Sequence, residues 1–246
     1  MNTSALSTID YQESGDVARV TLKTPHINMK MLRELTAVCD HLEDQSETKV
    51  VVFRGSNGTF CTGIDFEEFR PDQPMDIHGF NKWEKLCVRI ERLPKVTIAA
   101  MEGSVVGGGF QLALVCDSRI ASPTASFQLN EVFLGFLPGM ACFRLAKYIG
   151  LGRAKRMIMQ CPVFDAHKAV SLGLVDDVFY DLEDGINQTI EIFGPIHTVT
   201  IELSRRLLNE SYATDFENSI GNFLAAQHRA ITQTAFLDTL KARRKE

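Results

Sequence analysis

The sequence predicts an α/β core followed by a helical C-terminal part, and three observations lead to this prediction. The 246 residues are 45% hydrophobic and 23% charged, which is typical of a folded globular protein. Short apolar runs alternate with segments of helical periodicity as far as Val178. From Leu182 onward only helical periodicity remains, interrupted at Gly194 and Pro195 and weakened over Ser211–Thr214.

The elements of the first half follow from apolar periodicity. An alternating pattern predicts a strand of the sheet-edge type, and two continuous apolar runs predict strands buried on both faces. Two segments place their apolar residues on one helical face, and Pro94 ends the second of them. The predicted strands are Val17–Lys23, Lys49–Phe53 and Lys95–Met101, and the predicted helices are Met29–Leu42 and Phe80–Leu93.

The second half continues the alternation with shorter elements. A glycine run follows the strand Lys95–Met101, and a helix is predicted from Gln111 to Cys116. The stretch Asp165–Val178 predicts a short helix that stops at Gly173 and then a strand. Further strands are predicted over Arg119–Ala121 and Ser126–Leu129, and further helices over Gly139–Ile149 and Arg153–Met159.

Charge and composition narrow the class of protein. The formal net charge of −5 argues against a general nucleic-acid-binding or anionic-membrane-binding protein. The six cysteines form no C-x-x-C pair and no tight cluster, which indicates reduced thiols rather than a disulfide framework. No basic segment with a following apolar run opens the sequence, and no apolar stretch has membrane-spanning length. We therefore expect a cytoplasmic protein.

The segment Val105–Gln111 reads V-V-G-G-G-F-Q and comes directly after a predicted buried strand. Glycines that open a helix present bare backbone N–H groups to an anion, although three glycines also allow close helix–strand packing. The spacing matches neither the dinucleotide-binding fingerprint nor the phosphate-binding P-loop. By itself the run therefore leaves both interpretations open.

The run has two companion segments, and together they identify a family. Upstream, Phe60–Phe66 reads F-C-T-G-I-D-F, and downstream, Ala125–Gly139 reads A-S-F-Q-L-N-E-V-F-L-G-F-L-P-G. With the segments Ile98–Gly103 and Asp165–Val178, these resemble the crotonase, or enoyl-CoA hydratase/isomerase, superfamily over nearly the whole chain. Several motifs in the family's order are more specific than the glycine run alone.

The resemblance implies a fold and a class of substrate. The fold is a crotonase-type spiral of ββα units over residues 1–193, with a C-terminal helical trimerisation region over residues 194–246. The substrate is an acyl thioester carried by coenzyme A or by an acyl carrier protein. No metal or redox cofactor is implied, because the CoA or phosphopantetheine is part of the substrate. Homotrimers or dimers of trimers are the implied assembly, without nucleic-acid or membrane partners.

The resemblance also assigns an oxyanion hole. Ile64 and Gly108 match the positions whose backbone N–H groups bind the thioester oxygen as it becomes an enolate oxygen. Their neighbours Gly63, Asp65 and Gly107 are expected to contact the substrate as well.

Two polar residues are the candidate catalytic groups. Glu131 matches the second of the two glutamates of the family's hydratases, and we expect it to be half-buried beside aromatic residues, with a raised pKa. Gln111 stands where those hydratases have their first glutamate. A glutamine holds a water or hydroxyl by hydrogen bonds but is no carboxylate base. Gly139 matches the glycine near the reacting atoms, where some isomerases and dehalogenases carry an aspartate.

Two further residues are candidates for substrate contact. Trp83, the only tryptophan, belongs either to the core or to an aromatic wall of the acyl pocket, and its neighbours Lys82 and Lys85 are either solvated or close to substrate phosphates. His228 lies on a terminal helix and is either a surface residue or a substrate contact, as its counterpart is in some specialised relatives.

The first functional hypothesis is therefore an acyl-thioester hydratase or dehydratase with one glutamate acid/base. The second is an enoyl-CoA isomerase. The third is a specialised enzyme of polyketide or antibiotic assembly: a dehydratase of 3-hydroxy-3-methylglutaryl groups on a carrier protein, a decarboxylase or a C–C bond-forming synthase. The non-enzymatic alternative is a silent thioester-binding scaffold.

Overall fold

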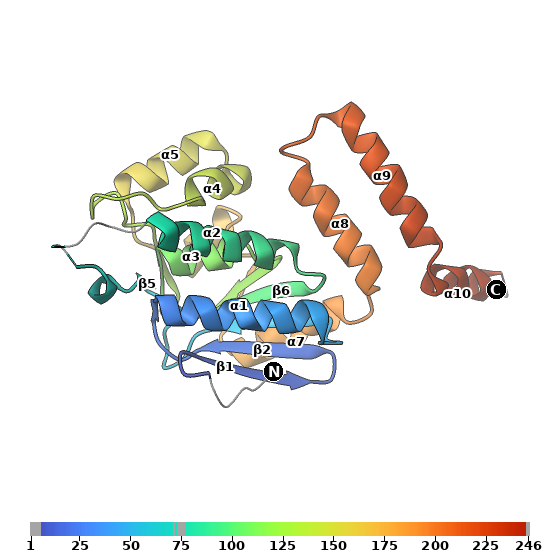
Figure 1. Ribbon diagram of the computed structural model, residues 1–246, viewed down its shortest axis with the longest axis horizontal. Helices are drawn as coiled ribbons and strands as arrows, with labels where there is room; N and C mark the ends of the chain where they lie inside the picture. Colours follow the sequence, from blue (N-terminus) through green and yellow to red (C-terminus); the bar gives the residue numbers. More distant parts are fainter. Residues whose placement is uncertain (1–5, 71, 73–76, 245–246) are drawn as a thin grey trace. The chain divides into compact units, whose positions relative to one another are not determined.

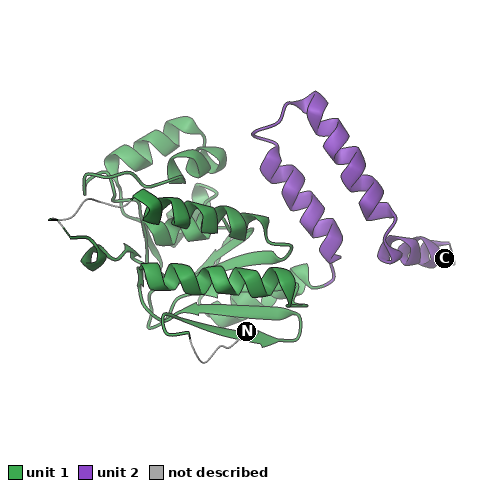
Figure 2. Cartoon of the chain, in the orientation of Figure 1, with its two compact units in different colours: residues 1–194 green, residues 195–246 purple. Residues whose placement is uncertain are grey.

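A computed structural model describes residues 6–70, 72 and 77–244. The chain divides into two compact units, residues 1–194 and residues 195–246, shown in two colours in Figure 2. Among the described helices, none is long and apolar enough to cross a membrane.

The first unit is built on a six-stranded sheet with the order β1-β2-β4-β6-β8-β11. Figure 1 labels three of its strands, β1, β2 and β6. β1 pairs with β2 in antiparallel fashion, and every later pair is parallel. The strands are β1 (Ile9–Ser14), β2 (Val17–Leu22), β4 (Val50–Arg54), β6 (Val96–Met101), β8 (Ser118–Ala121) and β11 (Asp177–Val178). The two continuous apolar runs form β4 and β6 at the centre, where both faces are buried.

Two smaller sheets carry segments that form the candidate active site. A three-stranded sheet has the order β10-β9-β7, and β3 pairs with β5 in parallel. These strands are β3 (His26–Ile27), β5 (Gly63–Ile64), β7 (Ser104–Val106), β9 (Ser126–Gln128) and β10 (Phe164–Asp165). They are only two or three residues long, which explains why the sequence pattern predicts just one of them, β9.

Two amphipathic helices pack side by side over this unit, as Figure 1 shows. In α1 (Met29–Asp44) the Asn28 side chain caps the first turn by accepting from the Met31 N–H at 2.9 Å. α2 (Ile77–Arg92) buries Trp83, Leu86, Cys87 and Ile90, as its periodicity predicts, and ends before Pro94. The remaining helices of the unit are α3 (Gly108–Leu114), α4 (Ala141–Ile149), α5 (Leu151–Gln160), α6 (Ala166–Ser171) and α7 (Leu182–Phe193).

The second unit consists of α8 (Thr198–Glu210), α9 (Phe216–Ile231) and α10 (Thr234–Arg243). α8 and α9 pack against each other. Among the described residues of this second unit, only Leu203 is a buried hydrophobic residue. Large apolar side chains on α9 and α10 are exposed, including Phe216, Phe223, Leu224 and Leu237.

Two predicted elements were wrong in detail. Val17–Lys23 was expected at a sheet edge, but β2 lies between β1 and β4. The edge strand is β1, which has only Ile9 and Tyr11 as buried apolar residues and therefore gives a weak periodic signal. The helix expected from Gln111 begins at Gly108, because the second and third glycines of the run are already helical.

Candidate active site

The glycine turn connects β7 to α3 and is built from backbone conformations that other residues rarely adopt. Gly107 is the N-cap of α3 with φ +55° and ψ −120°, and its N–H donates to the Gln128 carbonyl at 3.0 Å. The first intrahelical bond runs from the Gln111 N–H to the Gly107 carbonyl. The N–H groups of Gly108, Gly109 and Phe110 therefore have no partner within the helix.

The three glycines have different neighbours. Gly109 allows close packing of the helix, whereas Gly107 and Gly108 lie at the candidate site. A Cβ on Gly109 would come 2.6 Å from the Cys61 carbonyl oxygen, so this glycine allows α3 to pack on the preceding loop. A Cβ on Gly107 would come 2.8 Å from Glu131 Oε1, and a Cβ on Gly108 would lie 3.8 Å from Trp83 Cζ2. Gly107 thus lies against Glu131, whereas Gly108 lies closest to Ile27, whose Cδ1 is 2.8 Å from the Gly108 Cβ position, with Trp83 farther away.

The loop that carries Ile64 lies against the same turn. β3 aligns Ile27 with Ile64, and a Cβ on Gly63, whose φ is +92°, would be 3.5 Å from the Gly108 nitrogen. Residues that are 45 positions apart in the chain (108 − 63) are thereby brought together. The Asp65 carboxylate accepts from the Glu67 N–H at 3.1 Å and caps the short 3₁₀ helix Phe66–Glu68. Asp65 therefore has a local structural role at this loop.

Glu131 is buried more deeply than expected, at 3% exposure rather than half. Of the apolar neighbours expected around it, Val132 and Phe133 are 39% and 70% exposed, whereas Phe127 is fully buried. The Glu131 carboxylate turns inward to Gly107. Burial raises the pKa of this carboxyl, and backbone hydrogen bonds at Glu131 and Asn130 lower it in part.

Gln111 projects from α3 and is 4% exposed. Gly139, with φ +47°, lies against its amide, since a Cβ there would be 3.0 Å from Gln111 Oε1 and 3.2 Å from Nε2. The structure thus places Gln111 and Gly139 together, as the sequence motifs imply.

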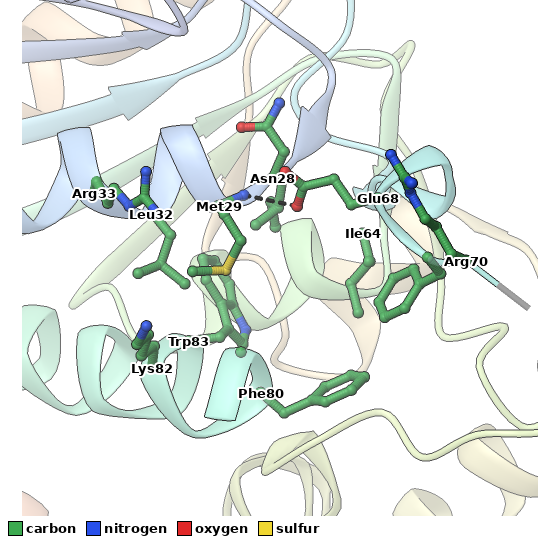
Figure 3. Close-up of a pocket in the computed structure, with 13 residues that line it drawn as sticks. Asn28, Met29, Leu32, Arg33, Ile64, Glu68, Arg70, Phe80, Lys82 and Trp83 are labelled. Carbon is green, nitrogen blue, oxygen red and sulfur yellow. Dashed lines mark hydrogen bonds between the residues drawn. The ribbon is translucent and has the colours of Figure 1, made fainter. Parts of the chain in front are cut away.

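Trp83 forms one wall of a cavity of about 420 Å³ beside Gly108 (Figure 3). Ile64 and Phe80 lie across the cavity from the indole, and Met29 packs over it. The full lining is Ile27, Asn28, Met29, Leu32, Arg33, Ile64, Glu68, Phe69, Arg70, Gly79, Phe80, Lys82 and Trp83. The walls are largely apolar, and the charged lining residues are three cations, Arg33, Arg70 and Lys82, and one carboxylate, Glu68, which accepts from the Met29 N–H. The excess of positive charge suits a chain that carries an anionic group. Lys85 does not line this cavity but an adjoining groove between α1 and α2.

The loop after Ile64 closes this cavity through ring and backbone contacts. Phe69 stacks on Phe80 with ring centroids 6.1 Å apart, and Phe66 meets Phe136 edge-on at 5.9 Å. Glu68 Oε2 accepts from the Met29 N–H at 2.8 Å, the dashed bond in Figure 3. The loop is therefore tied to α1, to α2 and to the segment that follows Glu131.

Three buried side-chain polar atoms in the described part of the chain have no hydrogen-bond partner. They are Trp83 Nε1, Gln111 Oε1 and Glu131 Oε2. Leaving a buried donor or acceptor unpaired costs about 1–3 kcal/mol, so such groups usually meet an ordered water, a ligand or a reacting group. All three lie around Gly107, Gly108 and Gly139, in one place in the fold.

A family model for enoyl-CoA hydratase/isomerase matches residues 12–243. The chain belongs to this family. The prediction of a crotonase-superfamily enzyme from the sequence motifs is therefore confirmed, and so is the predicted α/β class of fold.

Relatives of the family agree with this assignment along nearly the whole chain. The short-chain-enoyl-CoA hydratase of Clostridium acetobutylicum is 30% identical over 96% of this chain and 97% of its own. The crystal structure of an enoyl-CoA hydratase from Bacillus anthracis matches with a TM-score of 0.90 at 26% identity, covering 97% of this chain and 96% of its own. A Thermobifida fusca relative, solved in complex with CoA, matches with a TM-score of 0.83 at 25% identity, covering 94% and 95%.

His228 is the one candidate residue outside the first unit of this enoyl-CoA hydratase/isomerase family member. It lies on α9 and is exposed. Its proposed contact with substrate stays a prediction.

Sequence reasoning did not single out several residues of the site. Phe69, Phe80 and Glu68 shape the cavity, but they come from a loop and a helix with no distinctive motif. Glu84 lies beside Gly139 and resembles any exposed helix acid in the sequence. The only available signal was their closeness in the chain to Ile64 or Trp83.

Proposed function

We propose that this protein catalyses the reversible addition of water to a 2-enoyl thioester, or the reverse dehydration of a 3-hydroxyacyl thioester. The observation that supports this most directly is the buried Glu131 carboxyl, whose Oε1 lies at the glycine turn and whose Oε2 has no hydrogen-bond partner in the described part of the chain. Burial keeps its pKa above the ordinary value, which suits a group that both accepts and donates a proton.

In the proposed reaction, the backbone N–H groups of Ile64 and Gly108 bind the thioester oxygen. Glu131 takes a proton from water as the water oxygen bonds to C3, and the electron pair moves onto the thioester oxygen. The enolate then takes the proton from Glu131 at C2. Each oxyanion-hole donor is expected to contribute about 3–4 kcal/mol to the transition state.

Gln111 would hold the water through its free Oε1, and Gly139 would leave room for it. One carboxylate then does the work that two share in the family's standard hydratases. The same arrangement also suits isomerisation of a 3-enoyl thioester, because a single carboxylate suffices to move a proton between C4 and C2. Isomerisation is the second candidate function for this reason.

We propose that the cavity beside Gly108 receives the thioester. Ile27, Leu32, Phe80 and Trp83 would contact its methylene groups, while Arg33, Arg70 and Lys82 offer positive charge to the phosphates of CoA or of a phosphopantetheine arm. The relative solved with CoA supports a CoA substrate.

We also propose that the chain forms trimers through its second unit. The exposed apolar side chains of α9 and α10 are more than a monomer of this class usually leaves in water.

The test uses three substrates and mass spectrometry. A gain of 18 mass units, the mass of one water, on crotonyl-CoA supports hydration. Conversion of a 3-enoyl-CoA to the conjugated isomer, monitored by the appearance of enoyl absorbance because the mass does not change, supports isomerisation. Loss of water or carbon dioxide only from 3-hydroxy-3-methylglutaryl on an acyl carrier protein would replace both with a specialised pathway step. Binding without turnover of any of them would indicate a silent scaffold.

A further inference from the structure

A second carboxylate lies next to the site, on the helix that carries Trp83. Glu84 Oε1 accepts from the Met140 backbone N–H at 2.8 Å, and Glu84 Oε2 accepts from Arg144 Nη1 at 2.9 Å. Met140 is the N-cap of α4, and Arg144 lies one turn further along that helix. Glu84 therefore joins α2 to the start of α4.

Gly139 lies directly between this carboxylate and Gln111. A Cβ on Gly139 would overlap Glu84 Oε1 and would also be 3.0 Å from Gln111 Oε1. Glu84 thus holds the turn on one side while Gln111 faces it on the other. Any displacement of the Gly139–Met140 turn changes the space in front of the Gln111 amide.

The charge of Arg144 gives this contact its strength. The Arg144 side chain is 6% exposed, and its second carboxylate partner, Glu91, is 3.7 Å away, beyond hydrogen-bond distance. Glu84 thus makes the close ion pair with a buried cation, and removing one partner of such a pair is strongly destabilising.

Only a carboxylate satisfies both contacts of Glu84. Met140 and Arg144 both present donors, so both oxygens have to accept. A glutamine in the same place has one acceptor, and its NH₂ group would face either an N–H or a guanidinium.

We propose that Glu84 is a positioning residue of the active site, which holds the Gly139–Met140 turn against Gln111 so that the Gln111 amide meets the reacting water. Glu84 acts through the turn and does not transfer a proton. This inference rests on the proposed hydratase or isomerase function, because the role of Gln111 does.

The test compares Glu84→Gln with Glu91→Gln as a matched control. Both variants remove one carboxylate from Arg144 on the same helix, but Glu91→Gln leaves the bond to Met140 in place. We expect kcat of Glu84→Gln to fall about 10- to 100-fold, with KM changed less than about threefold, because orientation and not binding is lost. Glu91→Gln should keep kcat within about twofold.

Met140→Pro provides a second variant if Glu84→Gln does not fold. It removes the N–H that Glu84 accepts and puts the proline Cδ in its place, which pushes the Glu84 carboxylate away from the turn, while the Met140 φ of −76° is compatible with proline. The same loss of kcat is expected, and combining it with Glu84→Gln should add little further loss.

Amide hydrogen exchange tests the role of Glu84 without relying on turnover, so it distinguishes an error in this inference from an error in the proposed function. Peptides over residues 139–144 should exchange faster in Glu84→Gln than in Glu91→Gln, whatever substrate the protein turns over. An inactive wild type with this difference in exchange overturns the proposed function alone. Equal exchange in the two variants, or wild-type kcat in Glu84→Gln or Met140→Pro, overturns the role of Glu84.

Discussion

Gly107→Ala is expected to have two effects that can be measured separately. One is a loss of stability through backbone strain, and the other is a loss of activity through displacement of Glu131. Its φ of +55° with ψ −120° lies in a region that residues with a Cβ rarely occupy. Such strain costs about 1–3 kcal/mol. In a chain of this length, 1 kcal/mol corresponds to about 2–4 °C of Tm, so we expect Tm to fall by about 2–12 °C.

A second effect of Gly107→Ala falls on the chemistry. The new methyl would lie 2.8 Å from Glu131 Oε1, whereas ordinary contacts begin at 3.4 Å. The carboxylate therefore has to move by several tenths of an ångström. Since a misplacement of about 1 Å costs on the order of 100-fold in rate, we expect kcat/KM to fall about 10- to 100-fold per folded molecule.

The control for this prediction is Gly173→Ala. Gly173 also has a positive φ, +74°, but nothing lies within 4 Å of its Cβ position. Thermal unfolding and the loss of enoyl absorbance with crotonyl-CoA would be measured on both variants. If both lose the same activity per folded molecule, Glu131 is not the group that Gly107 accommodates, and the reasoning is refuted.

Three further outcomes are expected. Gln111→Glu should raise hydration of crotonyl-CoA, measured as kcat, because a second carboxylate joins Glu131; an unchanged or lower kcat would show that one carboxylate is what the site requires. Glu34→Gln should be less stable at pH 7 in urea unfolding, because hydrogen bonds from Thr8 and Ser7 outweigh the effect of burial and lower the pKa of Glu34 to about 2. The stability that Glu34 contributes is present above its unfolded pKa of about 4.3 and is lost as the pH falls toward 2, so a variant with the wild-type pH slope would contradict its role. Light scattering should give three or six times the 27.5 kDa of one chain, and a monomer would contradict the proposed assembly.

Local patterns in the sequence predict the elements that carry the core. Lys49–Phe53 and Lys95–Met101 were predicted as buried strands because an uninterrupted apolar run has few other stable environments. The short strands β3, β5, β7 and β10 have no such signal, since their pairing is decided by segments far away in the chain.

In the site, too, residues within sequence motifs could be predicted, whereas residues defined by contacts between distant segments could not. Motifs that resemble the family placed Ile64, Gly108 and Glu131 in one site, and the structure brings their segments together at the glycine turn. Glu84 could not be found in this way, because its two partners lie 56 and 60 residues away. Glu131 was expected to be half-buried, and the structure buries it further, to 3% exposure, because its carboxylate packs against Gly107 from a distant segment.

The proposed function depends on proton transfer by Glu131, and Glu131→Gln removes that ability alone. Turnover of the substrate identified for the wild type and the Kd for its thioester would be measured on the same preparation. We expect turnover to be lost while Kd stays within about threefold, because glutamine fills the same space without a carboxylate. Turnover close to that of the wild type would show that Glu131 is not the acid/base.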